Sequence, residues 1–205
     1  VHNNGGEGLV VYGGKGGSTL RNNIVYNNWS VNIYIDNQPN GIIDRNLIYS
    51  QEPNPDDLRN NGDTESKDEK NLRRLRPEGI MTADEKYGLT PPANLNNIKI
   101  TNNVIIGCRR GITHYGQAQG SGLKNVLIAN NTIVLPDAQG EGEDFIGINV
   151  PYNNGNNSGT VYTNNIVFAS HPSTYLLNVE TAMNGDFHGV TFQNNLWFHK
   201  NSKRD

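Results

Sequence analysis

The sequence predicts an all-β solenoid in which three short strands repeat along the chain. Two observations carry this prediction. A polar doublet ending in asparagine stands directly before a short run of strand-forming residues at several places, and the residues before each doublet alternate between apolar and polar as in a strand. The doublets end at Asn23, Asn46, Asn103, Asn131, Asn165 and Asn195.

Each repeat contains a further strand-like segment upstream of the doublet. These segments read GLVVYG, VNIYID, GIMTAD, GITHYG, IGINVP and YLLNVE. The unit is therefore strand, loop, strand, asparagine corner, strand. The extra length of the later repeats falls in the loop between the first two strands. A solenoid accepts such insertions because each coil contacts only its neighbours.

Three short strands per turn with an asparagine corner resemble the right-handed parallel β-helix of the pectate-lyase-like superfamily, over nearly the whole chain. The resemblance implies about six coils, with corner asparagines in the left-handed conformation and an asparagine ladder running from coil to coil. Asparagine suits this role because it tolerates that backbone region and its amide both donates and accepts hydrogen bonds. A β-sandwich or antiparallel barrel would instead need regularly placed hairpin turns, which the sequence lacks.

We expect residues 1–205 to form a single domain, interrupted at 52–78 by a charged insertion in which Ser66 and Glu69 fit a helix-capping box. The insertion is either a solvated segment or a wall of a binding groove. The chain starts inside the third strand of a coil, and neither end carries an amphipathic helix. We therefore expect a fragment of a longer protein. The alternative is an intact solenoid whose open ends are capped by a partner or by end-to-end association.

Composition excludes several function classes. A net charge of −3 and a pI near 6.0 give no electrostatic footprint for nucleic acid and no polybasic patch for a membrane. No apolar run reaches the length of a membrane span. The single cysteine, Cys108, excludes an internal disulfide and a cysteine-based zinc site, so we expect a buried, inert thiol.

Alternation in the first strand of each repeat separates inward from outward positions. His114 falls on an inward position, so we expect a core imidazole there rather than a general base. In the resembled family the outer face of one such sheet forms a polysaccharide-binding groove. Tyrosine rings stack on sugars, and amides and carboxylates pair with hydroxyls. The outward residues expected to bind substrate are Tyr34, Tyr115, Asn149, Asn178 and Glu180.

The resemblance also implies one of two chemistries. A glycoside hydrolase needs two carboxyl groups, and the acidic residues on consecutive coils are Asp36 with Asp84 or Glu85, our candidate catalytic residues. The same three side chains are the candidate ligands if the protein uses Ca²⁺, which requires several converging oxygens.

A polysaccharide lyase needs a base, and the candidates are Lys15, Arg109 and Arg110. The sequence therefore predicts a secreted or cell-surface protein that binds or cleaves a polysaccharide, by lyase or hydrolase chemistry. This prediction rests mainly on the family resemblance. The alternative is a non-catalytic surface module, such as a stalk, an adhesin or a filament building block.

Overall fold

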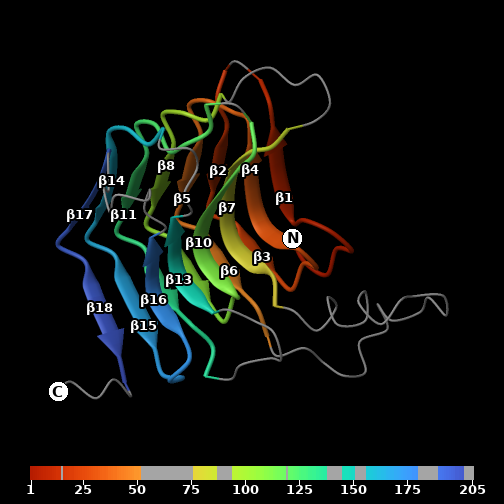
Figure 1. Ribbon diagram of the computed structural model, residues 1–205. Helices are drawn as coiled ribbons and strands as arrows, with labels where there is room; N and C mark the ends of the chain where they lie inside the picture. Colours follow the sequence, from red (N-terminus) through yellow and green to blue (C-terminus); the bar gives the residue numbers. More distant parts are fainter. Residues whose placement is uncertain are drawn as a thin grey trace.

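The computed structural model of the chain describes residues 1–14, 16–51, 76–86, 94–118, 120–137, 145–150, 156–179 and 189–200. Within them the chain forms strands β1 to β18, arranged in three sheets of six (Figure 1). Every pairing is parallel, and each coil passes through the three sheets in turn. This is the predicted all-β solenoid of six coils with three short strands each.

We name each sheet after its first strand. The β1 sheet contains β1 (Leu9–Tyr12), β4 (Val31–Asp36), β7 (Glu78–Asp84), β10 (Arg110–Gly116), β13 (Ile146–Val150) and β16 (Tyr175–Val179). The β2 sheet contains β2 (Thr19–Arg21), β5 (Ile42–Asp44), β8 (Lys99–Thr101), β11 (Leu127–Ala129), β14 (Thr160–Thr163) and β17 (Val190–Gln193). The β3 sheet contains β3 (Ile24–Tyr26), β6 (Leu47–Tyr49), β9 (Val104–Ile106), β12 (Thr132–Val134), β15 (Ile166–Ala169) and β18 (Leu196–His199).

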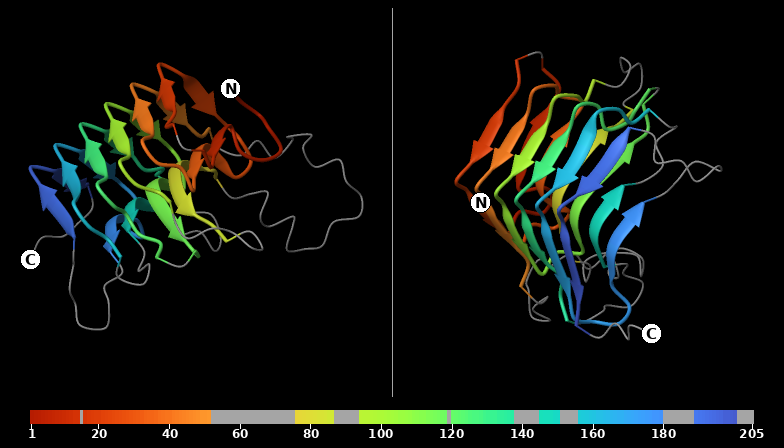
Figure 2. Two further views of the ribbon diagram at one scale, coloured as in Figure 1. Left: turned by 90° about the horizontal axis from the view of Figure 1, so that it is seen from above. Right: turned by 90° about the vertical axis from the view of Figure 1, so that its left-hand side faces the viewer.

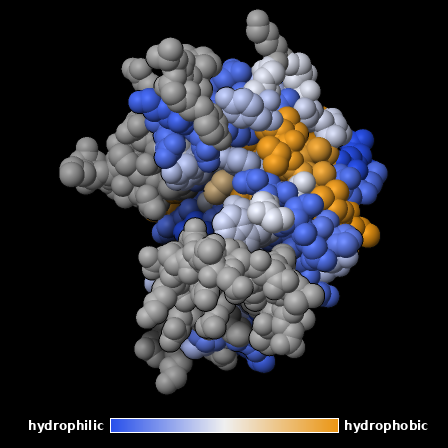
Figure 3. Space-filling model, turned by 90° about the vertical axis from the view of Figure 1, so that its right-hand side faces the viewer, coloured by the Kyte–Doolittle hydropathy of each residue, from blue (hydrophilic) through white to orange (hydrophobic). Residues whose placement is uncertain are grey.

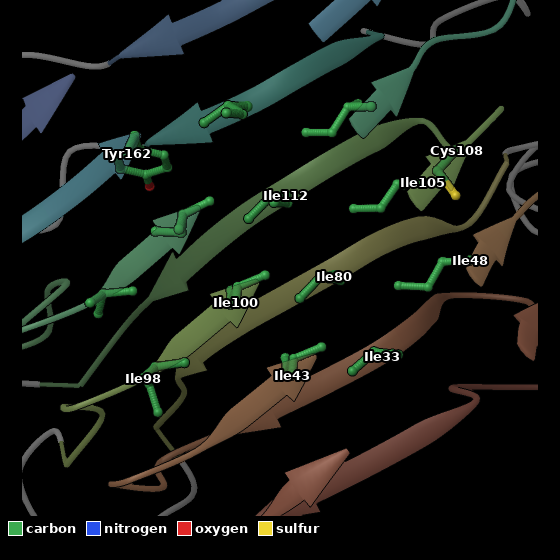
Figure 4. Close-up of a cluster of buried hydrophobic side chains, with 14 of the residues drawn as sticks. Ile33, Ile43, Ile48, Ile80, Ile98, Ile100, Ile105, Cys108, Ile112 and Tyr162 are labelled. Carbon is green, nitrogen blue, oxygen red and sulfur yellow. The ribbon is translucent and has the colours of Figure 1, made fainter. Parts of the chain in front are cut away.

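The coils stack without stagger, from the coil of β1 to the coil of β16 (Figure 2). Equivalent residues of successive coils are therefore direct neighbours, as in the buried column Ile33, Ile80, Ile112 and Ile148 of the β1 sheet. Isoleucines of the other two sheets meet this column inside the solenoid (Figure 4). β-branched side chains suit this interior because they pack well on a pleated surface.

The asparagine ladder is confirmed. The two residues of each doublet have different structural roles. The second residue forms the rung. Asn131, for example, is fully buried, donates from Nδ2 to Asn165 Oδ1 at 3.0 Å and to the Ile100 carbonyl at 2.9 Å, and accepts from the amide and backbone N–H of Asn103. The pattern repeats along Asn23, Asn46, Asn103, Asn131, Asn165 and Asn195.

The first residue of each doublet supplies the bend. Its backbone is left-handed in every coil, with φ between 54° and 58°, at Asn22, Arg45, Asn102, Asn130, Asn164 and Asn194. Arg45 shows that the side chain there is not required to be an amide. Its guanidinium instead lies 3.3 Å from the carboxylate of Asp44. The ladder therefore depends on the second position, and the turn depends on the first.

The structure also shows where the charged insertion, Cys108 and the first coil lie. Strand β7 begins at Glu78, the last residue of the charged insertion, and residues 52–75 of that insertion lie outside the described residues. Cys108 is buried in the core, and burial raises the pKa of its thiol to about 12. Leu9 and Leu20 of the first coil pack only partly buried against the core, and Figure 3 shows an apolar patch on the side where β1 lies.

Replacing a central rung should destabilise the solenoid more than replacing an end rung. Asn131→Ala removes the acceptor for two buried Asn103 donors and leaves the Ile100 carbonyl without its amide donor. We expect a loss on the order of 3 kcal/mol in the free energy of unfolding, measured with urea. Asn195→Ala is the matched control, because water reaches this half-buried rung. Equal losses in the two variants would contradict the role assigned to the buried ladder.

Candidate functional site

Two columns of side chains line the outer face of the β1 sheet. The register places Tyr34 in one column with Met81, Thr113, Asn149 and Asn178 of the following coils, one residue per coil. It places Asp36 in the second column, between Tyr12 and Ala83, with Tyr115 on the coil after Ala83. The predicted pattern of faces is thus correct, and four of the five expected substrate-binding residues lie on one surface: Tyr34, Tyr115, Asn149 and Asn178. The fifth, Glu180, lies outside the described residues.

Asp36 and Glu85 lie together at the end of this face. The backbone N–H of Glu85 donates to Asp36 Oδ1 at 3.0 Å, and the Tyr34 hydroxyl donates to Glu85 Oε1. Asn37 ties the two together by donating to Asp36 Oδ1 and to the Glu85 carbonyl, each at 2.9 Å. Because the chain after β7 crosses Asp36 in this way, Asp36 is only 1% exposed, whereas Glu85 is half-buried.

An amide row continues the polar surface across the later coils. Asn178 donates to Asn149 Oδ1 at 2.8 Å, and Asn149 donates to Thr113 Oγ1 at 3.1 Å. Tyr115 lies beside this row and is 42% exposed, with Gln117 donating to its hydroxyl. Tyr115 is therefore open to a ligand, whereas Glu85 and Asn178 are partly exposed. Tyr34 and Asn149 are largely covered and serve to hold their neighbours.

Asp84 faces the other way. It follows Ile80 and Thr82 on the inward side of β7 and is fully buried. Its Oδ1 accepts the backbone N–H groups of Asn94 and Leu95 at 3.0 and 2.9 Å. Burial raises the pKa of this carboxyl, and these hydrogen bonds oppose the rise. The alternation of β7 therefore separates Asp84 from Asp36 and Glu85, although all three lie close in the sequence pattern.

His114 and Ser121 complete a polar network inside the solenoid. Ser121 Oγ lies 3.3 Å from Asp84 Oδ2 and 3.4 Å from His114 Nε2. His114 Nδ1 lies 3.0 Å from the carbonyl of Thr82, which can only accept, so Nδ1 carries the proton. All three side chains are buried, so this serine, histidine and aspartate constellation has a structural role. His114 is the core imidazole that its inward position predicts.

The candidate lyase bases do not join the outer face. Arg109 and Arg110 both donate to Oε1 of the buried Glu78, at 2.9 and 2.8 Å. This ion pair lies at the start of β10, at the opposite end of the strand from Tyr115. Lys15 lies outside the described residues.

Ca²⁺ binding stays a prediction. Its candidate ligands on the outer face are Asp36 and Glu85. Among the described side chains, no group of three or more histidines, cysteines, aspartates and glutamates is arranged to hold a metal ion. Asp84, the third predicted ligand, accepts hydrogen bonds from backbone N–H groups on the inner side of its sheet.

No helix in the described part of the chain is long and apolar enough to cross a membrane.

Comparison with known families agrees with this geometry. The family model described as the right-handed beta helix region matches residues 1–142. The chain belongs to this right-handed β-helix family. No curated protein and no solved structure matches it. Membership establishes the fold of the β-helix and leaves the chemistry of its outer face to the residues just described.

Two residues of these sites, Asn37 and Ser121, have no clear motif in the sequence that predicts their role. Asn37 follows Asp36 and adopts a left-handed backbone with φ 51°, which turns its amide toward Glu85. An asparagine directly after a strand is the available signal for this bend. Ser121 stands between two glycines in a loop, and only the folded β-helix brings it to His114 and Asp84.

Burial of His114 should make the stability of the β-helix depend on pH. Desolvation lowers the pKa of His114 from 6.5 to about 4, so the unfolded chain binds a proton that the folded chain excludes. The free energy of unfolding should therefore fall by about 3 kcal/mol, from this residue alone, as the pH drops from 6.5 to 4. The raised pKa of Asp84 acts in the opposite direction, because the folded chain takes up that proton first as the pH drops.

The difference between wild type and His114→Asn isolates the histidine. Urea unfolding at several pH values between 4 and 7 should show a flatter acid limb for the variant. Parallel pH profiles for the two proteins would contradict this assignment.

Proposed function

We propose that this β-helix binds a polysaccharide along the outer face of the β1 sheet. One observation carries the proposal. Glu85 and Asp36, from adjacent coils, lie on the same face as the exposed Tyr115 and the amide row of Asn149 and Asn178. An aromatic side chain for ring stacking, beside amides and carboxylates for hydroxyl groups, suits an extended sugar chain.

The charge of this face favours a neutral glycan over a uronate polymer. The described positions of the two outer columns from Val10 and Tyr12 onward contain one carboxylate, that of Asp36, and the amides of Asn149 and Asn178, but no lysine or arginine. Along the described positions of these columns, a uronate carboxylate would meet the carboxylate of Asp36 and no lysine or arginine. The arginines considered as lyase bases are occupied by Glu78.

For cleavage, this distribution supports hydrolase chemistry over lyase chemistry. A glycoside hydrolase uses one carboxyl group as acid and a second as base or nucleophile. Glu85 is the accessible member of the pair, and its Oε1 is oriented by Tyr34. Asp36, covered by the backbone of Glu85, would act on a sugar only at the end of this face where β4 and β7 terminate.

Binding is tested first, because it does not require catalysis. We expect Tyr115→Ala to weaken binding of a neutral glycan about tenfold, as measured by affinity electrophoresis against xylan, mannan and galactan, since the loss of one stacking contact has this magnitude. Trp29→Ala is the matched control, because Trp29 is an aromatic residue with the same 42% exposure that lies before the start of β4, at the other end of that strand from Asp36. A Tyr115→Ala variant that binds as tightly as wild type would remove Tyr115 from the proposed site.

Cleavage is tested separately, by release of reducing sugar ends. Glu85→Gln should lower turnover at least about a hundredfold while binding is retained, because the amide can neither donate a proton as an acid nor act as a base. Glu7→Gln, an exposed glutamate of the first coil, should leave turnover unchanged. Full activity in Glu85→Gln would refute the catalytic assignment. Binding without any turnover in wild type would favour a carbohydrate-binding module, and neither binding nor turnover would favour the structural surface module.

A further inference from the structure

The outer face of the β3 sheet is apolar along its whole length. Parallel pairing in register aligns its outward residues in two columns, one residue per coil in each. We call these twelve residues the apolar strip: Ile24, Leu47, Val104, Thr132, Ile166 and Leu196 in one column, and Tyr26, Tyr49, Ile106, Val134, Phe168 and Phe198 in the other.

The strip is open to solvent. Its most exposed side chains are between 37% and 56% exposed, namely Ile24, Leu47, Val104, Ile106, Ile166, Leu196 and Phe198. Together the twelve residues expose on the order of 700 Å², which is above the ~300–600 Å² of the largest apolar patch on a typical monomeric protein. It approaches the ~800 Å² that each partner buries in a standard interface. An apolar surface of this size marks an interaction site.

The rings of the strip argue against a sugar as its occupant. Tyr26 stacks on Tyr49 with ring centroids 4.5 Å apart, and His2 stacks on Tyr26 from the other side at 4.6 Å. Phe168 and Phe198 stack at 5.5 Å in the same way. Rings stacked along the column cover one another's faces. A sugar ring requires an open aromatic face, as Tyr115 provides on the β1 sheet.

The edge of the strip has the composition of an interface rim. The left-handed corner residues that precede the strip, including Asn22, Arg45 and Asn102, are exposed and polar in every coil. An uncharged apolar centre beside a polar rim is the usual anatomy of a protein interface. A charged partner, such as an acidic peptide or an anionic lipid surface, finds no complementary charge among the twelve positions.

We propose that the apolar strip is the interface of a symmetric dimer, in which two copies of this chain pack face to face through their β3 sheets. Six strands in register form a face about 24 Å long, and packed sheets lie about 10 Å apart with their side chains interdigitated. A two-fold axis through the strip, between β9 and β12, superposes an uncharged apolar surface on itself, so the strip is its own complement. The β1 sheet of each copy stays open, so the dimer does not depend on the function proposed for that sheet.

Sedimentation velocity over a range of protein concentrations tests the proposal. Wild type should sediment as a dimer, and the double variant Val104→Lys and Ile166→Lys should sediment as a monomer at the same concentrations. Both positions are exposed, at 38% and 43%, so the lysines can be solvated in the folded monomer, and circular dichroism and thermal unfolding check that it is folded. Val10→Lys, at an exposed valine on the outer face of the β1 sheet, is the matched control and should leave the dimer intact.

Cross-linking locates the interface. Thr132→Cys places a thiol at the centre of the strip, whereas Thr191→Cys places one on the exposed outer face of the β2 sheet. Cys108 does not interfere because it is buried. A short bis-maleimide should join two copies of Thr132→Cys and should not join copies of Thr191→Cys. A wild-type monomer at all concentrations, a double variant that remains dimeric, or a cross-link favouring Thr191→Cys would each overturn the proposal.

Discussion

The asparagine ladder sets the relation between one coil and the next. Each buried rung donates to a side chain in the following coil and to a carbonyl in the preceding one, and accepts two N–H groups in return. A buried amide left without these partners costs free energy, so neighbouring coils are held at one offset. Because the offset is constant, residues at the same place in different repeats become neighbours in space. Every surface column described above follows from this constraint.

The same frame presents two outer faces of opposite character. On the β1 sheet, side chains of adjacent coils hydrogen-bond to one another, as Asn178 does to Asn149. On the β3 sheet, they pack as aliphatic and aromatic neighbours, as Tyr26 does with Tyr49. Both sheets bury similar isoleucine columns on their inner side. The same kinds of side chain therefore recur in the interior of each coil. The outward positions of each sheet are not constrained by that packing, so they can bind different partners.

The sequence was informative wherever the repeat holds and less so where it breaks. The doublet ending in Asn131 predicts a rung because all its hydrogen-bond partners are themselves repeated elements. The alternation of β10 likewise predicts that His114 is inside and Tyr115 outside. Asp36 was predicted on the correct face, but its burial depends on the backbone of Glu85, which follows β7 and belongs to no repeat. Asp84 was grouped with Asp36 by its place after Ala83, whereas β7 continues through it and turns it inward.

The buried network of Asp84, Ser121 and His114 also bears on how the chain avoids misfolding. A solenoid built from nearly identical coils offers many wrong stackings of similar energy, since one isoleucine column fits another almost equally well. A carboxyl group in the interior removes this degeneracy. If the coil of β7 stacked on any other neighbour, Asp84 Oδ2 would be buried without the Ser121 hydroxyl, and a buried polar atom that loses its hydrogen-bond donor costs about 1–3 kcal/mol. Asp84, Ser121 and His114, which do not repeat from coil to coil, thus favour the correct stacking order of the coils that do repeat.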